Sequence, residues 1–119
     1  MDLRIQRFDE PDEKRRFEKG TFEIVTVGGV TLGRASYEPG WKWSEHVGPT
    51  VGTHLCEVEH VGIVLSGRAA VSMADGTEFV LESGDAFAIP PGHDSWVVGE
   101  EPYVSLHVQG ANHYAAAHD

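Results

Sequence analysis

Short stretches of apolar residues follow one another along most of the chain, and glycine or proline separates each stretch from the next. From Thr21 onward this punctuation is typical of an all-β protein. His60 also opens an apolar strand, and its side chain should share a face with Gly62 and Val64 because strand side chains alternate. The pattern predicts further strands at 22–27, 30–37, 68–74, 77–81, 86–89, 96–98 and 103–108, with 41–46 extended and 48–52 a loop.

Turn signals fall between these strands at near-even spacing. Gly28-Gly29 predicts a tight turn, and Asp75-Gly76 predicts a type I′ hairpin turn, in which both central residues need positive φ. Because no helical pattern alternates with the strands and no repeat appears, the fold class is all-β, a sandwich or barrel.

The two ends of the chain differ from its middle. Residues 1–20 are highly charged, and we expect an extended arm there with one turn of helix around 11–18. Residues 111–119 contain alanine and histidine and read as a helical or frayed tail. The expected organisation is therefore an N-terminal arm (1–20), one barrel domain (21–110) and a C-terminal tail (111–119).

Composition narrows the range of partners. The chain has 119 residues and a net charge of −10. Because this charge repels polyanions, we do not expect nucleic acid as a partner. No apolar run reaches the roughly 18 residues of a membrane span, so no membrane partner is expected. The first residues lack an apolar signal core and Cys56 is the only cysteine, which together favour a cytoplasmic setting.

Residues that commonly bind metals occur at regular intervals from Gly48 to Gly67. His54 follows Gly48 by six positions, Cys56 follows His54 by two, and His60 follows Cys56 by four. Side chains two or four apart on a strand share one face, so one strand can direct several ligands into a barrel.

A second motif follows the Asp75-Gly76 hairpin, with Gly84, Pro90 and Gly92 in G-D-A-F-A-I-P-P-G. Together the two motifs resemble those of the cupin family, in which the first reads G, five residues, H-x-H, three or four residues, E, six residues, G. The resemblance covers roughly residues 30–108. It implies a jelly-roll barrel (a double-stranded β-helix), and small cupins are typically homodimers, in which the arm can cover a sheet edge.

The chain departs from the cupin pattern at the ligands. Cys56 occupies the position of the second histidine in the first cupin motif, and His60 occupies the position of its glutamate. Ser95 occupies the histidine position of the second cupin motif, although His93 lies two residues earlier. The first motif can also be aligned in a second way, because His46 follows Gly40 by six positions, as the first histidine of the motif follows its glycine. Spacing does not decide between His46 and His54.

The predicted site is a divalent metal held by three or four of these side chains. Imidazole and thiolate ligands favour a transition metal, with zinc, iron or nickel foremost. Separately, each residue also has an ordinary structural explanation, as a buried cysteine or a surface histidine. The candidate ligands are His46, His54, Cys56, His60 and His93.

The expected function follows from this site and the resemblance. We expect a metal and a small organic ligand inside the barrel, and the resemblance implies dioxygenase- or isomerase-like chemistry if the protein is an enzyme. The alternative is a non-catalytic module that binds or senses a small molecule or metal. Glu45 and Asp94 lie beside His46 and His93. Either carboxylate could orient the neighbouring imidazole or act as a base, but strand alternation favours solvent exposure for both.

Overall fold

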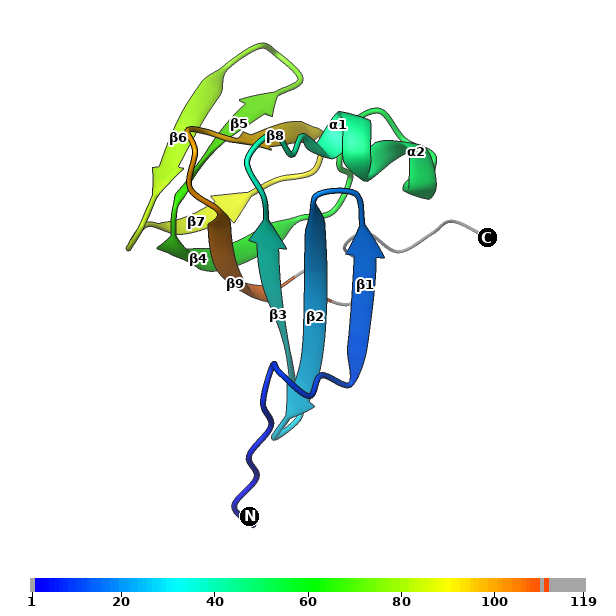
Figure 1. Cartoon of the computed structure of the whole chain (residues 1–119), viewed down its shortest axis with the longest axis vertical. Coiled ribbons are helices and arrows are strands. Elements are labelled where there is room, and N and C mark those ends of the chain that lie inside the picture. The colour runs from blue at the N-terminus through cyan, green and yellow to red at the C-terminus, as the bar shows by residue number, and fades with distance from the viewer. Residues whose placement is uncertain (1, 110, 112–119) are drawn as a thin grey trace.

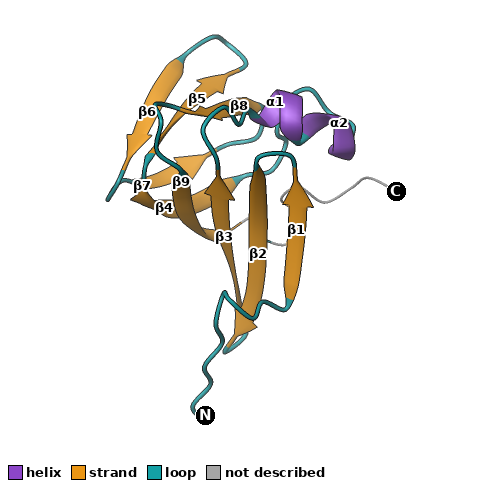
Figure 2. Cartoon of the chain, in the orientation of Figure 1, coloured by secondary structure: helices purple, strands orange, loops and turns teal. Residues whose placement is uncertain are grey.

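The described part of the chain, residues 2–109 and 111 of a computed structural model, contains nine β-strands and two short helices (Figures 1 and 2). The strands are β1 (Glu13–Phe17), β2 (Gly20–Val27), β3 (Val30–Tyr37), β4 (His60–Ser66), β5 (Arg68–Met73), β6 (Glu78–Glu82), β7 (Ala86–Ile89), β8 (His93–Val97) and β9 (Tyr103–Gln109). The helices are α1 (Trp43–His46) and α2 (Gly48–Val51). None of the described helices is long and apolar enough to cross a bilayer.

All strand pairs are antiparallel, and they form two sheets. One sheet has six strands in the order β1-β2-β3-β9-β4-β7, and the other has three in the order β6-β5-β8. The last strand, β9, lies between β3 and β4, and β8 pairs with β5, so connections cross from one sheet to the other. This arrangement confirms the predicted all-β jelly-roll barrel.

Aromatic side chains fill the barrel where the two sheets meet α1. Trp41 is 1% exposed and stacks on Tyr37 with ring centroids 3.7 Å apart, and Tyr37 in turn lies 5.9 Å from Tyr103. Phe22 is fully buried on β2, and Val64 on β4 is 1% exposed. Burial of each such side chain stabilises the folded state by about 2 kcal/mol, and these contributions together are the main stabilisation of the barrel.

The predicted turn of helix around residues 11–18 is wrong, because this segment forms β1. Glu13–Phe17 pairs with β2 in antiparallel register, from Glu13 opposite Ile24 to Phe17 opposite Gly20. Lys14 and Arg16 are exposed whereas Arg15 and Phe17 are half-buried, which is the alternation of a strand. Phe17 packs against the Tyr37–Trp41 stack, and this contact outweighs the helical preference of the charged residues.

The two helices replace segments predicted as extended or loop. Residues 43–46 form α1, and an acceptor from a distant strand stabilises its start, since the Ser44 N–H donates to Asp94 Oδ1 at 3.0 Å. Residues 48–51 form the single turn α2, with Pro49 in the first turn, where its missing N–H costs nothing, and Gly52 at the C-cap in the left-handed region (φ 84°).

The hairpin between β5 and β6 is present, but its turn is not type I′. Only Gly76 has positive φ (89°), and its N–H donates to Met73 O at 2.9 Å. The N–H of Met73 donates to Thr77 O at 2.8 Å, so a three-residue loop with a left-handed glycine closes the hairpin.

Candidate metal centre

His60 begins β4 and points into the barrel. It is 3% exposed, and Gly62 and Val64, two and four residues further along the strand, are buried as well. Glu59 and Glu57 are exposed on the other side. His60, Gly62 and Val64 therefore share one face of the strand, as predicted, and the structure shows that this face points into the barrel.

Backbone hydrogen bonds hold Cys56 beside His93, although Cys56 lies outside the named strands. The Cys56 N–H donates to His93 O at 2.7 Å, and the Gly92 N–H donates to Cys56 O at 2.8 Å. Cys56 is 1% exposed and His93 is 3% exposed. This bridge joins the first sequence motif to the second.

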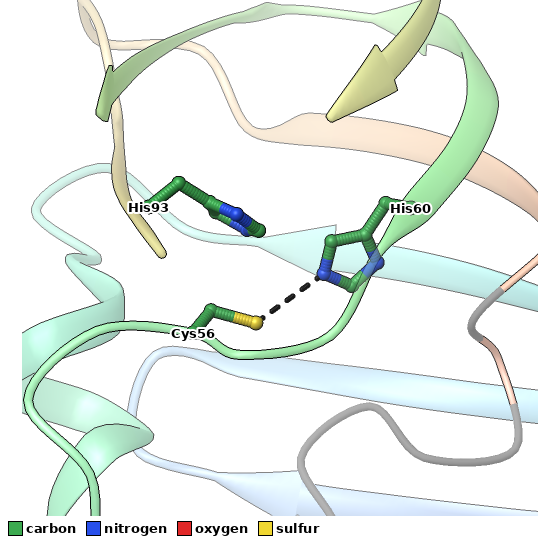
Figure 3. Close-up of side chains that lie close together, drawn as sticks. All are labelled: Cys56, His60 and His93. Atoms are coloured by element: carbon green, nitrogen blue, oxygen red, sulfur yellow. Dashed lines mark hydrogen bonds between the residues drawn. The ribbon is translucent and has the colours of Figure 1, made fainter. Parts of the chain in front are cut away.

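The side chains of Cys56, His60 and His93 converge (Figure 3). One ligand atom from each lies within 4.8 Å of the other two, and Cys56 Sγ is 3.4 Å from His60 Nε2. A tetrahedral zinc ion with typical Zn–S and Zn–N bonds separates sulfur and nitrogen by about 3.6 Å. The observed separation therefore suits two ligands of one ion.

The orientation of His93 leaves one ring nitrogen for a ligand. His93 Nδ1 lies 2.8 Å from the carbonyl oxygen of Pro90, an acceptor that fixes the proton on Nδ1. Nε2 then keeps its lone pair. A backbone acceptor behind a metal-binding imidazole is the usual arrangement in proteins.

Burial controls the protonation of the three groups. It raises the pKa of the Cys56 thiol to about 12, so the sulfur is a thiol at neutral pH unless a metal displaces the proton. Burial, followed by the charges of His107 and His93, lowers the pKa of His60 well below 6.5, and burial also lowers the pKa of His93. Both imidazoles are therefore neutral at pH 7, the form that binds a metal.

A small cavity of about 40 Å³ lies next to the cluster. Leu81, Phe87 and other apolar or aromatic side chains line much of it. Its lining also includes His60, His93, Ser95, Ser105 and His107, and the phenol of Tyr103 lies beside Ser105. No carboxylate, lysine or arginine belongs to the described residues that line it.

His107 on β9 is a functional candidate that the sequence motifs did not indicate. Its ring centroid is 5.2 Å from that of His60, the same separation as between His60 and His93. The Ser105 hydroxyl lies 2.9 Å from His107 Nε2. Burial, and to a lesser extent the charge of His93, lowers the pKa of His107 to about 4. The alternation of Tyr103, Ser105 and His107 was the available signal, since a strand places all three on one face.

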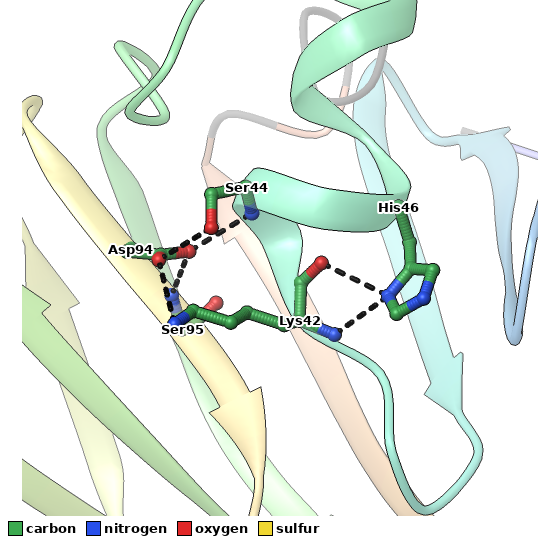
Figure 4. A network of polar contacts seen from close by, with 5 residues as sticks. All are labelled: Lys42, Ser44, His46, Asp94 and Ser95. Atoms are coloured by element: carbon green, nitrogen blue, oxygen red, sulfur yellow. Dashed lines mark hydrogen bonds and ion pairs between the residues drawn. The ribbon is translucent and has the colours of Figure 1, made fainter.

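The structure does not bring His46 or His54 to this cluster. His46 lies on α1, where the Lys42 N–H donates to His46 Nδ1 at 2.9 Å (Figure 4). Its Nε2 is 4.0 Å from Glu18 Oε2. His54 is exposed in the loop after α2. Of the five candidate ligands, therefore, Cys56, His60 and His93 are adjacent and the other two lie elsewhere.

Asp94 turns away from the cavity, as strand alternation predicts, but it is not in solvent. It is 9% exposed because α1 covers it, and its carboxylate accepts hydrogen bonds from the Ser44 hydroxyl at 2.7 Å and the Ser44 N–H at 3.0 Å (Figure 4). Lys42 Nζ lies 3.9 Å from the same carboxylate. Its exposure was therefore predicted wrongly, whereas Glu45 is exposed as expected.

The fold and the cluster together define the class of protein: a small jelly-roll barrel with a candidate metal site on its inner wall. The family model described as "Cupin domain" (Cupin_2) matches residues 33–108, more than half of the chain. The protein therefore belongs to the cupin family. A comparison with curated proteins finds no match.

Solved structures support the same fold. A protein of unknown function from Rhizobium leguminosarum bv. viciae is 26% identical with a TM-score of 0.64, covering 92% of this chain and 97% of that one. A cupin-like protein from Thermotoga maritima is 19% identical with a TM-score of 0.58, covering 82% and 73%. A variant of oxalate decarboxylase from Bacillus subtilis is 22% identical with a TM-score of 0.63, covering 92% of this chain but only 30% of that enzyme.

Proposed function

We propose that the protein binds one divalent transition metal through Cys56, His60 and His93, with zinc, iron or nickel as the candidates, and that the barrel holds a small ligand beside it. The observation that carries this proposal is the convergence of one sulfur and two imidazole nitrogens within 4.8 Å of one another in a buried position. A divalent metal would give the buried sulfur and both imidazole nitrogens one shared polar partner.

The ligand set suits such a metal in number and in kind. Thiolate and imidazole are intermediate to soft donors, which zinc, nickel and ferrous iron accept and magnesium or calcium do not. Three protein ligands leave a position open, as in catalytic rather than structural zinc sites. When bound there, the metal supplies a Lewis acid for a ligand in the cavity. A thiolate ligand must stay reduced, which fits the cytoplasmic setting that we propose.

Metal analysis of the purified full-length protein tests the site. We expect about one metal per chain, lost on dialysis against a chelator and restored by zinc. Cys56→Ala, His60→Ala and His93→Ala should each lower the metal content to a small fraction while the barrel stays folded by circular dichroism. Matched controls are His46→Ala and His54→Ala, which should retain the metal. If these controls lose the metal and the first three variants keep it, the assigned ligand set is wrong.

A non-catalytic binding module is a second candidate, and the lining of the cavity favours it. No carboxylate among the described residues that line the cavity is available as a general base for dioxygenase- or isomerase-like chemistry. Oxygen uptake and product analysis on a panel of small acids separate the candidates. Turnover that needs His60 supports an enzyme, whereas ligand binding without turnover supports the binding module.

We also propose that the protein forms a homodimer through its N-terminal arm. Leu3 is 87% exposed and Ile5 is 66% exposed, and two apolar side chains two residues apart suit the pairing of an extended segment with another chain. The segment that precedes β1 lies near the turn between β2 and β3 in Figure 1. Sedimentation equilibrium should show a dimer for the full chain and a weaker dimer for Leu3→Asp/Ile5→Asp. A monomer for the unaltered chain would contradict the proposal.

A further inference from the structure

An apolar groove lies between β6 and β7, the strands at which the two sheets end (Figure 1). Each is the last strand of its sheet, so neither has a neighbour on its outer side among the described strands. The ten described residues that line this β6–β7 groove are all apolar, and Phe79 and Val80 among them are 56% and 55% exposed. Exposed apolar side chains beside free strand edges suit an extended segment, which pairs with an edge and buries those side chains together.

The charges around the groove are negative. Residues 69–92, which contain all of β6 and β7, include four acidic residues and no lysine or arginine. The four are exposed: Asp75, Glu78, Glu82 and Asp85. Arg68 precedes this segment, and its guanidinium lies beside Gly99. A positively charged segment therefore suits the groove better than a neutral or acidic one.

The same charges argue against pairing of β6 with β6 of a second copy. An antiparallel pair centred on Val80 would place Glu78 of one copy opposite Glu82 of the other. Like charges directly opposite one another in a sheet are destabilising. The occupant of the groove should therefore be a different segment of the chain or of a partner.

Residues 2–7, here called the leading segment, have the complementary features. They precede β1, and all six are exposed. Leu3 and Ile5 supply two apolar side chains, and residues 3–7 contain two arginines, Arg4 and Arg7, and no acidic residue. The segment therefore combines positive charge with two apolar side chains at the spacing of a strand.

We propose that the leading segment of a second copy occupies the β6–β7 groove as a strand beside β6. This inference rests on the homodimer proposed above and assigns the surface that receives the arm. In Figure 1 the leading segment lies near the β2–β3 turn, whereas β6 lies at the opposite end of the molecule. The occupant of each groove is therefore the segment of the other copy, and a two-fold exchange fills both grooves.

Strand alternation on the two sides matches in this arrangement. Phe79 and Leu81 share the face of β6 that lines the groove, and the glutamates at positions 78 and 82 lie on the opposite face. In the leading segment, Leu3 and Ile5 share one face and Arg4 lies on the other. Pairing thus places apolar side chains against apolar side chains, and it places Arg4 on the side of the two carboxylates.

Sedimentation equilibrium of the full-length protein tests the apolar contact. Phe79→Asp should raise the dissociation constant of the dimer about tenfold or more, as expected for loss of a residue at the centre of an interface. The matched control is Val108→Asp, because Val108 on β9 is 50% exposed and is not among the residues that line the groove. If Val108→Asp weakens the dimer as much as Phe79→Asp, the assigned surface is wrong.

Charge reversal tests the polar side of the pairing. Arg4→Glu should weaken the dimer, and adding Glu78→Arg/Glu82→Arg to the same chain should restore much of the affinity. Adding Glu100→Arg/Glu101→Arg instead changes the net charge by the same amount at two exposed positions before β9, and it should not restore affinity. Equal restoration by this control pair would show an effect of overall charge and would overturn the pairing.

Cysteine variants show which chain supplies the segment. Leu3→Cys and Phe79→Cys, prepared separately and then mixed, should form a disulfide-linked dimer on mild oxidation, whereas neither variant should do so alone. A double variant that instead closes a disulfide within one chain would show that the segment occupies its own groove, and the assignment to a second copy would be overturned.

The outcomes separate this inference from the homodimer itself. If Leu3→Asp/Ile5→Asp weakens the dimer but Phe79→Asp does not, the arm contacts another surface, so the homodimer stands and the groove assignment fails. If the unaltered chain is a monomer, both proposals fail together.

Discussion

His107 should make the metal-free protein lose stability as the pH falls. Burial lowers the pKa of His107 to about 4 in the folded protein, against 6.5 for an ordinary histidine. Between these values the unfolded chain binds a proton that the folded protein does not, so stability is unaffected above pH 7 and decreases from pH 6.5 down to pH 4. Each pKa unit corresponds to about 1.4 kcal/mol, so the full loss is about 3 kcal/mol, of which about 2 kcal/mol has occurred by pH 5.

Urea denaturation at pH 7.5 and pH 5, in the presence of a chelator, measures this loss. His107→Phe is the comparison, because its ring can occupy the same place between Phe22 and Phe87, whose centroids are 5.4 Å and 5.5 Å from that of His107. Carboxylates titrate alike in both proteins, so the difference between the two pH-dependent losses reports the contribution of His107, including the effect of its charge on His60. We expect the variant to lose about 2 kcal/mol less than the unaltered protein. Equal losses would show that the His107 imidazole is already protonated in the folded state and would refute the reasoning.

Three further predictions concern packing, the cover of the site and the metal. Gly62→Ala should destabilise the protein by about 3 kcal/mol in urea denaturation, because a Cβ there would overlap the backbone carbonyl of Leu106 on the paired strand. The control is Gly76→Ala in the open hairpin turn, which tests the cost of positive φ alone. Asp94→Ala should cost about 2 kcal/mol by removing the hydrogen bonds to Ser44; an unchanged urea midpoint would count against this cover of α1. Zinc at a hundredfold excess over its Kd should raise the free energy of unfolding by about 2.7 kcal/mol, and thermal denaturation should show no such increase in His60→Ala.

Much of the barrel was predictable because its strands have a local signature. The inward face of His60 and Val64 follows from the two-residue period, and the positions of β3 and β7 follow from the turn residues that bound them. The strand β1 was not predicted, because its charged residues resemble a helix and its apolar contact, Phe17 against Tyr37 and Trp41, is made with residues distant in sequence.

The candidate site was predictable only in part, for a related reason. Spacing identified Cys56, His60 and His93 as candidate ligands together, but it did not decide between His46 and His54 as the first ligand. Ligand spacing does not show that His46 belongs to a helix and therefore lies away from the other ligands. The helix α1 depends on Asp94, fifty positions after Ser44. His107 has no neighbouring motif, and only the pairing of β9 with β4 brings it beside His60.

The bridge between Cys56 and His93 is made by main-chain atoms, and this has a consequence for how the family can diversify. The hydrogen bonds that fix the backbone at position 56 do not involve the side chain of that residue. A substitution that replaces the sulfur ligand with nitrogen or oxygen would therefore change which metal ion the site prefers and the reduction potential of that ion, while the surrounding backbone stays intact. Such a position lets a lineage change its inorganic chemistry in a single mutational step.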